Sequence, residues 1–189
     1  LHMPLQSGSD EVLRRMRRSY RSTKFLGILD RVREAIPHAA ITTDIIVGFP
    51  GETQKDFEKT LAVMEEAKFD SAFTFKYSPR PGTKASEYEA VVPEKEKQVR
   101  LDELLALQKC HTLFRNSQEV GKTVDVLVEK ESKKSSEQWA GRTDNNKWVV
   151  FSKENAEIGE IVKVTIKDAK GITLFGELLK NQENADAIA

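Results

Sequence analysis

The spacing of apolar residues along the chain changes at about Ser117. Before it, short apolar runs alternate with segments whose apolar residues recur every three or four positions, which is typical of strands alternating with helices. After it, apolar and polar residues alternate, as in Val124, Val126 and Val128, which is typical of strands with one buried face. The change predicts an α/β domain, a small all-β domain and a loose tail, over residues 1–117, 118–180 and 181–189.

The first domain is predicted to alternate helices with parallel strands. Its helices are expected over residues 10–21, 22 or 23 to 36, 54–68 and 93–116, and its strands over residues 40–47 and 71–77. In the first strand, Ile45, Ile46 and Val47 are consecutive and apolar, the pattern of a parallel strand covered by helices on both faces. The second strand alternates and gathers aromatic residues, including Phe73 and Phe75, on one face.

The second domain is predicted to contain only short strands. They are expected around residues 124–128, 138–143, 147–151, 162–166 and 172–178. So many short strands in so small a domain favour a small closed β-barrel of the oligonucleotide-binding kind.

A glycine-rich turn, Gly48 to Gly51, follows the first apolar strand. The carboxyl end of a parallel strand is where an α/β sheet opens a crevice for ligands, and glycine lets the backbone approach a ligand closely. Thr53 and Asp56 then form a helix-capping pattern. The spacing is neither that of a phosphate-binding loop nor that of a dinucleotide fingerprint. A ligand-facing corner and an ordinary strand-to-helix turn are therefore both open.

The first helix is predicted to carry a basic face. Leu13, Met16 and Tyr20 share one side of it, as a core stripe does. The other side carries Arg14, Arg17, Arg18 and Arg21. Charged helix faces are usually just solvated, but like charges at this spacing repel one another and favour an anionic partner. A carboxylate or an RNA phosphate would fit.

The overall charge balance argues against a general attraction to nucleic acid or to membranes. Lys plus Arg and Asp plus Glu number 30 each, so the formal net charge is zero. Any RNA site must therefore be a local patch of cations. No stretch approaches the ~20 apolar residues of a membrane span, and we expect a cytoplasmic protein, with an organellar matrix as the alternative.

Cys110 is the only cysteine of the sequence. A single cysteine cannot form a disulfide within the chain, and it cannot supply the several thiolates that hold an iron–sulfur cluster. Its helical pattern predicts a small buried packing residue. The helix around it is expected to bury Leu101, Leu104, Leu105, Leu107, Leu113 and Phe114.

Several segments carry motifs that occur in a fixed order. In the first domain they are LHMPLQSGSDEVLRRMRRSY, TDIIVGFPGET and YSPRPGT, starting at Leu1, Thr43 and Tyr77. These closely resemble motifs of the radical S-adenosylmethionine methylthiotransferases, most of all the branch that modifies tRNA. In the second domain, VGKTVDVLVE, GRTDNNKWVVF and GEIVKVTI resemble the TRAM domain, an RNA-binding barrel. The family's cluster-binding CxxxCxxC is absent from this chain.

The resemblance implies a fold. The first domain is expected to form the second half of a partial TIM-like barrel, with parallel strands alternating with helices, and a small OB-like barrel is expected to follow. Residues 1–5 then correspond to the end of the barrel's fourth strand, and their abrupt apolar start is expected of a piece cut from a longer protein.

The resemblance also implies S-adenosylmethionine and 4Fe-4S clusters as cofactors, with the clusters held outside this chain. The candidate cofactor-binding residues are Gln6, Ser7, Ser9, Arg17, Asp44, Gly48, Phe49, Gly51 and Tyr77. Among them, Arg17 is assigned to the methionyl carboxylate and the turn at 48–51 to the adenosine. Gln6, Ser7 and Ser9 have turn or helix-cap chemistry as the alternative. Asp44 is the one charge of its strand, so it must be paired or lie at a solvated ligand edge.

The candidate RNA-binding residues are Arg14, Arg18, Arg21, Ser78, Arg80, Lys133, Lys134, Arg142, Lys147 and Trp148. In the second domain, the cations would hold phosphates while the tryptophan ring stacks a base. The alternatives are a rigid surface loop at 77–83, lysines that only aid solubility, and tryptophans that belong to the barrel core.

The implied parent enzyme adds a methylthio group to N6-isopentenyladenosine beside the tRNA anticodon, by radical chemistry. Its partners would be the anticodon stem-loop of tRNA and an electron donor for the cluster. This chain is expected to hold no catalytic or metal-binding residue and to be inactive alone. A ribosomal-protein aspartate methylthiotransferase is the alternative within the family, and a noncatalytic RNA-binding module is the alternative outside it.

Overall fold

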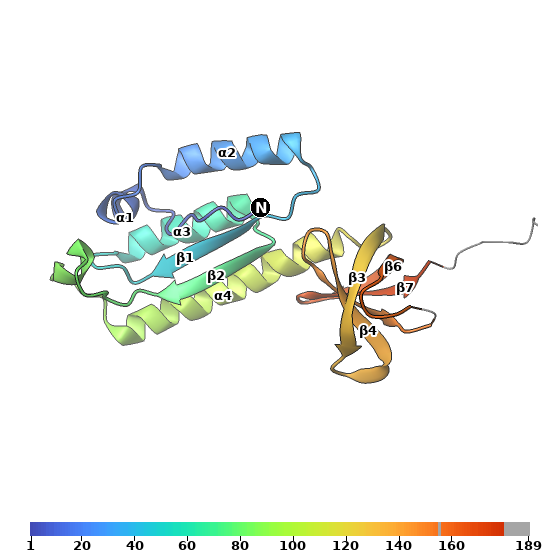
Figure 1. Ribbon diagram of the computed structural model, residues 1–189. Helices are drawn as coiled ribbons and strands as arrows, with labels where there is room; N and C mark the ends of the chain where they lie inside the picture. The colour runs from blue at the N-terminus through green and yellow to red at the C-terminus, as the bar shows by residue number, and fades with distance from the viewer. Residues whose placement is uncertain (155, 180–189) are drawn as a thin grey trace, which may run out of the picture. The chain divides into compact units, whose positions relative to one another are not determined.

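The computed structural model describes residues 1–154 and 156–179 (Figure 1). The tail predicted at 181–189 lies outside these residues. The chain divides into a first compact unit, Leu1–Arg115, and a second unit that begins at Asn116. Among the described residues, no helix is both long enough and apolar enough to cross a membrane.

The first unit is an α/β structure built around two parallel strands. Its elements are α1 (Asp10–Arg15), α2 (Ser22–Ala35), β1 (Thr42–Val47), α3 (Gln54–Ala67), β2 (Ser71–Lys76), the 3-10 helix η1 (Lys84–Glu87) and most of α4 (Glu94–Ser117). β1 and β2 pair in parallel along their whole lengths. Residues 1–6 follow the other edge of β1, with bridges from His2 to Thr42 and from Gln6 to Ile45.

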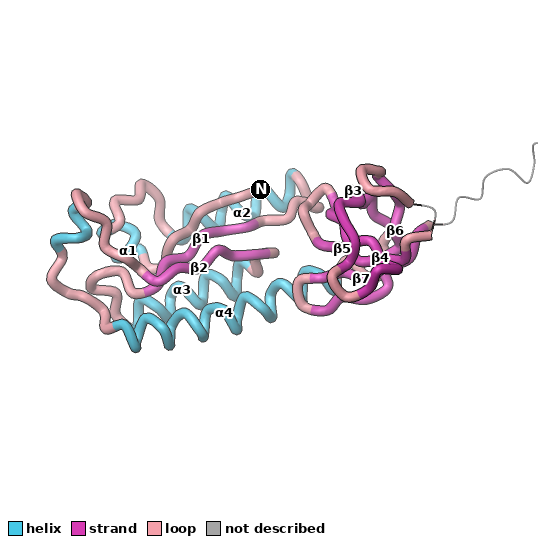
Figure 2. The backbone as a smooth tube through the Cα atoms, turned by 60° about the horizontal axis from the view of Figure 1, so that its bottom comes forward, coloured by secondary structure: helices cyan, strands magenta, loops and turns pink. Residues whose placement is uncertain are grey.

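The helices α2, α3 and α4 pack against one face of this sheet (Figure 2). Their shared core with β1 includes Phe25, Leu29, Ile45, Val47, Phe57, Met64 and Leu104. β1 consequently buries alternate residues, and Asp44 and Ile46 are only half-buried on its second face. The prediction that both faces of this strand are covered is wrong, because the helices gather on one side. On the second face Phe73 and Phe75 of β2 are 56% and 53% exposed.

The helix α1 is shorter than predicted. Ser9 caps its start by accepting a hydrogen bond from the Val12 N–H, as its capping pattern indicates. The helix ends at Arg15, because Arg17 adopts a left-handed conformation with φ of 59° and the N–H groups of residues 17 and 18 turn back onto carbonyls of the last turn. The continuous basic face predicted over residues 14–21 therefore does not form.

The start of α3 is the capping box that the sequence predicts. The Thr53 side chain accepts from the Asp56 N–H, and the Asp56 carboxylate accepts from the Thr53 N–H. Ser9 also donates to Asp56, at 2.6 Å. Burial would raise the pKa of the Asp56 carboxyl, but the hydrogen bonds from Ser9 and Thr53 outweigh burial and hold its pKa below the usual value.

The helix α4 buries a face that the leucine pattern did not indicate. Leu104 is buried and Leu101 and Leu107 are partly buried, whereas Leu105, Leu113 and Phe114 are 46%, 42% and 44% exposed. Cys110 is exposed, so its predicted packing role is wrong. The buried face is largely polar and carries Lys97, Arg100, Gln108, His111 and Thr112.

The second unit contains a closed five-stranded barrel, in the order β3-β4-β5-β7-β6. Its strands are β3 (Thr123–Ser132), β4 (Ser135–Thr143), β5 (Trp148–Ser152), β6 (Ile161–Lys170) and β7 (Thr173–Leu178). Neighbours are antiparallel except β5 and β7, which are parallel. The interior is filled by alternate residues, among them Val126, Val128, Val149, Phe151, Val164, Ile166 and Leu174. The predicted small closed barrel is confirmed.

Candidate functional site

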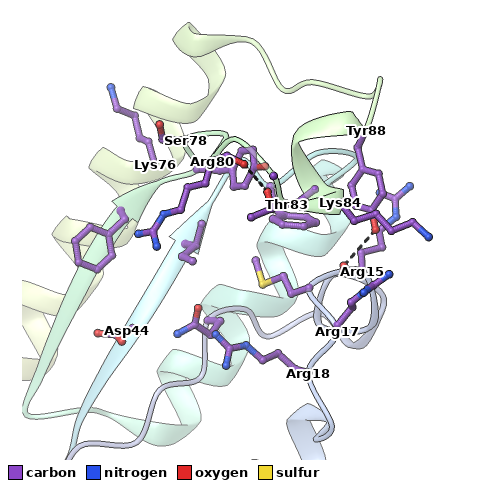
Figure 3. Close-up of a pocket in the computed structure, with 18 residues that line it drawn as sticks. Arg15, Arg17, Arg18, Asp44, Lys76, Ser78, Arg80, Thr83, Lys84 and Tyr88 are labelled. Carbon is purple, nitrogen blue, oxygen red and sulfur yellow. Dashed lines mark hydrogen bonds between the residues drawn. The ribbon is translucent and has the colours of Figure 1, made fainter.

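A cavity of about 850 Å³ lies in the first unit, at the carboxyl ends of β1 and β2 (Figure 3). It is bordered by residues 15–18 after α1, by the second face of the two strands and by the loop from Tyr77 to Tyr88. Because the helices pack on the other face, the ends of the strands are open to a ligand here.

The cavity brings together part of the predicted site. The candidates that line it are Gln6, Arg17, Arg18, Asp44, Phe49, Tyr77, Ser78 and Arg80. Ser7, Ser9, Gly48, Gly51, Arg14 and Arg21 are not among its lining residues. Ser9 instead caps α1, Ser7 Oγ lies 3.3 Å from Thr60 Oγ1, and Arg14 pairs with Glu11 at 2.8 Å.

The lining of the cavity is strongly cationic. Figure 3 shows Arg17 and Arg18 on one side and Lys76 and Arg80 on the other. Lys76 is paired with Glu94 at 2.6 Å. Among the described lining residues, Asp44 is the only carboxylate, and its Oδ2 lies 3.4 Å from Nε2 of His2. A ligand that carries both a carboxylate and a positively charged group matches this arrangement.

One wall of the cavity is aromatic. The Phe49 ring lies edge-on to Tyr77 and to Tyr88, with centroid distances of 5.0 Å and 6.2 Å. The Tyr77 hydroxyl is buried and has no hydrogen-bond partner among the described residues. A buried orphan hydroxyl is costly unless a ligand or water satisfies it, so this wall is suited to a flat ring with polar edges.

Sequence reasoning did not select several residues that line the cavity, among them Arg15, Lys84 and Tyr88. Arg15 Nη1 donates to the Pro50 carbonyl at 3.0 Å, which joins the end of α1 to the glycine turn. Lys84 begins the 3-10 helix η1 after YSPRPGT and Tyr88 directly follows it, in a segment where no apolar period indicates a role.

The two glycines of the turn are required by the protein itself. Gly48 and Gly51 have φ of 72° and 77°, a left-handed region that side chains disfavour. A Cβ at Gly48 would lie 2.4 Å from the stem of Lys97, which is buried, and one at Gly51 would meet the flexible Arg15 guanidinium. These contacts supply a structural reason for both glycines, and a close ligand approach at either stays a prediction.

A buried ion pair next to this turn stabilises it. Glu52 and Arg100 are 1% and 2% exposed in their side chains and pair at 2.7 Å. Glu52 Oε1 also accepts from the Gly48 N–H, at 2.8 Å, and Arg100 reaches Glu96 as well. Burial raises the pKa of Glu52, while the Gly48 N–H and Arg100 oppose that rise. α4 thus fixes the turn through a charge pair.

In the second unit, the RNA candidates lie in different surroundings. Lys133, Lys134 and Trp148 line a hollow of about 300 Å³. Arg142 does not line it, since its guanidinium lies over the Trp148 ring at 4.3 Å and donates to Asn146 at 2.7 Å. Lys147 donates to the Asn116 side chain at 3.0 Å.

Comparison with known proteins finds two family matches in this chain. Residues 1–64 match the Radical SAM superfamily, and residues 117–179 match the TRAM domain. The chain therefore carries a segment similar to radical SAM proteins, followed by a segment similar to TRAM domains. The resemblance inferred from the motifs is therefore confirmed.

Several curated relatives of this chain share one name. The tRNA-2-methylthio-N(6)-dimethylallyladenosine synthase of Corynebacterium jeikeium is 55% identical over 172 residues, which cover 89% of this chain and 34% of that protein. The synthase of the same name from Porphyromonas gingivalis is 48% identical, over 95% of this chain and 39% of that protein. The chain thus spans about a third of the length of the curated relatives it matches.

A solved structure supports the fold alone. Coproporphyrinogen III oxidase (HemN) from Escherichia coli, a radical SAM enzyme, is 16% identical and has a TM-score of 0.52. The match covers 76% of this chain and 40% of that one.

Proposed function

We propose that this chain forms the part of a tRNA methylthiotransferase that faces S-adenosylmethionine and binds tRNA. The parent enzyme would add a methylthio group to N6-isopentenyladenosine beside the anticodon. The observation that carries the proposal is the 48–55% identity to synthases named for this reaction, over 89–95% of the chain. The names of these relatives favour a tRNA substrate over a ribosomal-protein aspartate. A noncatalytic RNA-binding module would require the barrel only, and residues 1–64 match the Radical SAM superfamily instead.

For the first unit, we propose the second half of a partial TIM-like barrel. The parallel pairing of β1 and β2, the helices on one face and the cavity at the carboxyl ends of the strands all support it. Residues 1–6, bridged in parallel to β1, would belong to the preceding strand.

The cavity residues fit S-adenosylmethionine. Arg17 or Arg18 would bind the methionyl carboxylate, and Asp44 would bind the ammonium group. Phe49 and Tyr77 would hold the adenine, with the orphan Tyr77 hydroxyl as a polar contact. When bound, the cofactor supplies the radical chemistry, while these side chains orient it and exclude water.

The residues of this chain do not fit a 4Fe-4S cluster. The sequence has one cysteine, and no group of three His, Cys, Asp or Glu residues in the described part is placed to hold a metal. The cluster is therefore assigned to the part of the parent enzyme outside this chain, with its electron donor as a separate partner, and the chain alone is expected to release no deoxyadenosine.

A chimera tests the proposed function. The preceding two thirds of the Corynebacterium jeikeium synthase would be joined to this chain and expressed in a bacterium that lacks its own synthase. We expect 2-methylthio-N6-isopentenyladenosine in hydrolysed tRNA by mass spectrometry, with the intact relative as positive control. A folded chimera with its cluster loaded that leaves only N6-isopentenyladenosine would overturn the proposal.

A further inference from the structure

The hollow in the second unit has an apolar floor formed by neighbouring strands. Ala140 pairs with Val150, and Val150 pairs with Phe175, so the three side chains stand side by side across β4, β5 and β7. The adjacent residues Val149 and Leu174 belong to the barrel core, so this floor lies on the outer surface. Trp148 and Ile172 border it, and Ile172 is 68% exposed.

The tryptophan at the border is held in place by its neighbours. Arg142 lies over the Trp148 ring at 4.3 Å and is itself fixed by Asn146 and by Glu129, at 2.7 Å and 3.5 Å. Lys130, which lines the hollow, lies over the same ring at 4.5 Å. The ring is therefore an ordered surface beside the hollow with positive charge at its face.

The cations that line the hollow have no acidic partners among the residues that the structure describes. In the described part of the chain, no carboxylate lies within 4.0 Å of the ammonium groups of Lys130, Lys133 or Lys134, and none lines the hollow. Elsewhere on the barrel, lysines are paired with carboxylates, namely Lys122, Lys153, Lys163, Lys167 and Lys170. The unit is close to neutral overall, so this local excess of charge calls for an anion.

We propose that the hollow binds one unstacked nucleobase of single-stranded RNA. The base lies on the floor against Trp148, and its flanking phosphates contact Lys133 and Lys134 on the β3–β4 turn. Gln138 and Thr173 also line the hollow and offer hydrogen bonds to the edge of the base. A volume of about 300 Å³ admits one nucleotide, whereas a duplex keeps its bases stacked inside and out of reach. The inference rests on the proposed function, since it specifies how the tRNA-binding unit reads its partner.

Tryptophan fluorescence tests the stacking directly. The variant Trp139→Phe of the full chain leaves Trp148 as the only tryptophan, and Trp139 does not line the hollow. Titration with a short single-stranded oligoribonucleotide is expected to quench this variant, and a duplex of the same length is expected to quench it far less. The matched variant Trp148→Phe, which retains Trp139, is expected to show little quenching. Equal quenching in both variants, or none in Trp139→Phe while RNA is bound, overturns the proposal.

A second pair of variants changes exposed side chains, where substitutions have small effects on folding. Ile172→Glu places a carboxylate at the edge of the hollow, and Ile161→Glu makes the same change on β6, where the side chain is 71% exposed. Ile172→Glu is expected to weaken binding of the single strand between about five-fold and about a hundred-fold, the range of losing one base–aromatic stack. Ile161→Glu is expected to change it less than about two-fold. Equal affinities for the two variants overturn the proposal.

The two proposals fail in different ways. If the chimera modifies tRNA while the hollow variants bind RNA like the unaltered chain, the base site is wrong and the proposed function stands. If the hollow variants behave as expected while the chimera leaves tRNA unmodified, the base site stands and the proposed function is wrong.

Discussion

The stability of the turn at the cavity depends on Arg100, because this residue pairs with Glu52 and Glu52 binds the Gly48 N–H. The Arg100 guanidinium is almost fully buried and pairs with the Glu52 carboxylate at 2.7 Å. Removing one partner of a buried ion pair leaves the other charge unpaired, at a cost of about 3–5 kcal/mol. We expect Arg100→Leu to lower the free energy of unfolding in urea by about that amount. Lys95→Leu, an exposed change on the same helix, should alter it by less than about 0.5 kcal/mol, and equal effects would contradict this role.

Asp56 gives the stability of the first unit a pH dependence of known sign. Its pKa is lowered in the folded state, so its stabilising contribution is present above its unfolded pKa and is lost as the pH falls through the folded value. In thermal unfolding between about pH 5 and about pH 2, we expect Asp56→Asn to lose less stability than the unaltered chain. Glu66→Gln on the same helix is the control. A variant as acid-sensitive as the unaltered chain would refute the assignment.

Gly48 is predicted to be harder to replace than Gly82, another glycine of the first unit with a left-handed φ. Gly48→Ala combines a left-handed φ of 72° with a clash against the Lys97 stem. Gly82→Ala has a similar φ of 79° in open space, so it pays the conformational cost of about 1–2 kcal/mol alone. We expect Gly48→Ala to be destabilised more than Gly82→Ala in urea unfolding. Equal losses would mean that packing against Lys97 adds nothing.

At the scale of elements, the sequence predicted strands and caps better than helix faces. The alternation of apolar and polar residues in β3 and β6 predicts which side chains fill the barrel, because only one face of each strand packs in the barrel core. The Thr53 and Asp56 cap is local, so its residues alone specify it. The buried face of α4 is different, since Arg100 and Gln108 are buried by partners distant in sequence, Glu52 and the Phe69 carbonyl. A local apolar period cannot indicate such partners.

The end of α1 shows the same limit. Residues 10–21 carry a helical pattern, yet the helix closes at Arg15. The Asp10 carboxylate accepts from the N–H and hydroxyl of Ser22, at 2.8 Å and 2.9 Å, and thereby places the start of α2 beside that of α1. This arrangement directs Arg17 and Arg18 to the cavity, which helical spacing alone does not predict.

The β3–β4 turn carries a prediction on salt dependence. Each phosphate contact on a single strand contributes about 0.7 to the slope of log affinity against log salt. Lys133→Ala with Lys134→Ala should therefore reduce the slope for single-stranded RNA by about 1.4. Lys163→Ala with Lys167→Ala removes the same charge from lysines paired with acids, and should leave the slope nearly unchanged. Filter binding at several salt concentrations would measure both, and equal slopes would place the phosphates elsewhere.

At the scale of the whole molecule, the order of an α/β region and a small barrel followed from the change of hydrophobic period. The net charge is zero and indicates no class of ligand. Both candidate sites were therefore inferred from motifs and from local geometry. Five of the nine predicted cofactor residues line the cavity, namely Gln6, Arg17, Asp44, Phe49 and Tyr77. Of the other four, Ser7 and Ser9 form hydrogen bonds within the fold, and Gly48 and Gly51 lie in the turn beside the cavity. Spacing in the sequence does not distinguish such structural contacts from contacts with a ligand.

The affinity of the cluster-loaded chimera for S-adenosylmethionine tests the central claim most directly. Ile46 lines the cavity from the uncovered face of β1 and lies outside the core, so Ile46→Arg fills the proposed site without opening a void. Ile36→Arg makes the same change at a side chain that is 57% exposed and does not line the cavity. By equilibrium dialysis, we expect Ile46→Arg to weaken binding at least about ten-fold, since the charge and bulk of arginine exclude the sulfonium cofactor. We expect Ile36→Arg to leave it unchanged. Unchanged binding in both variants would contradict the assignment of this cavity to the cofactor.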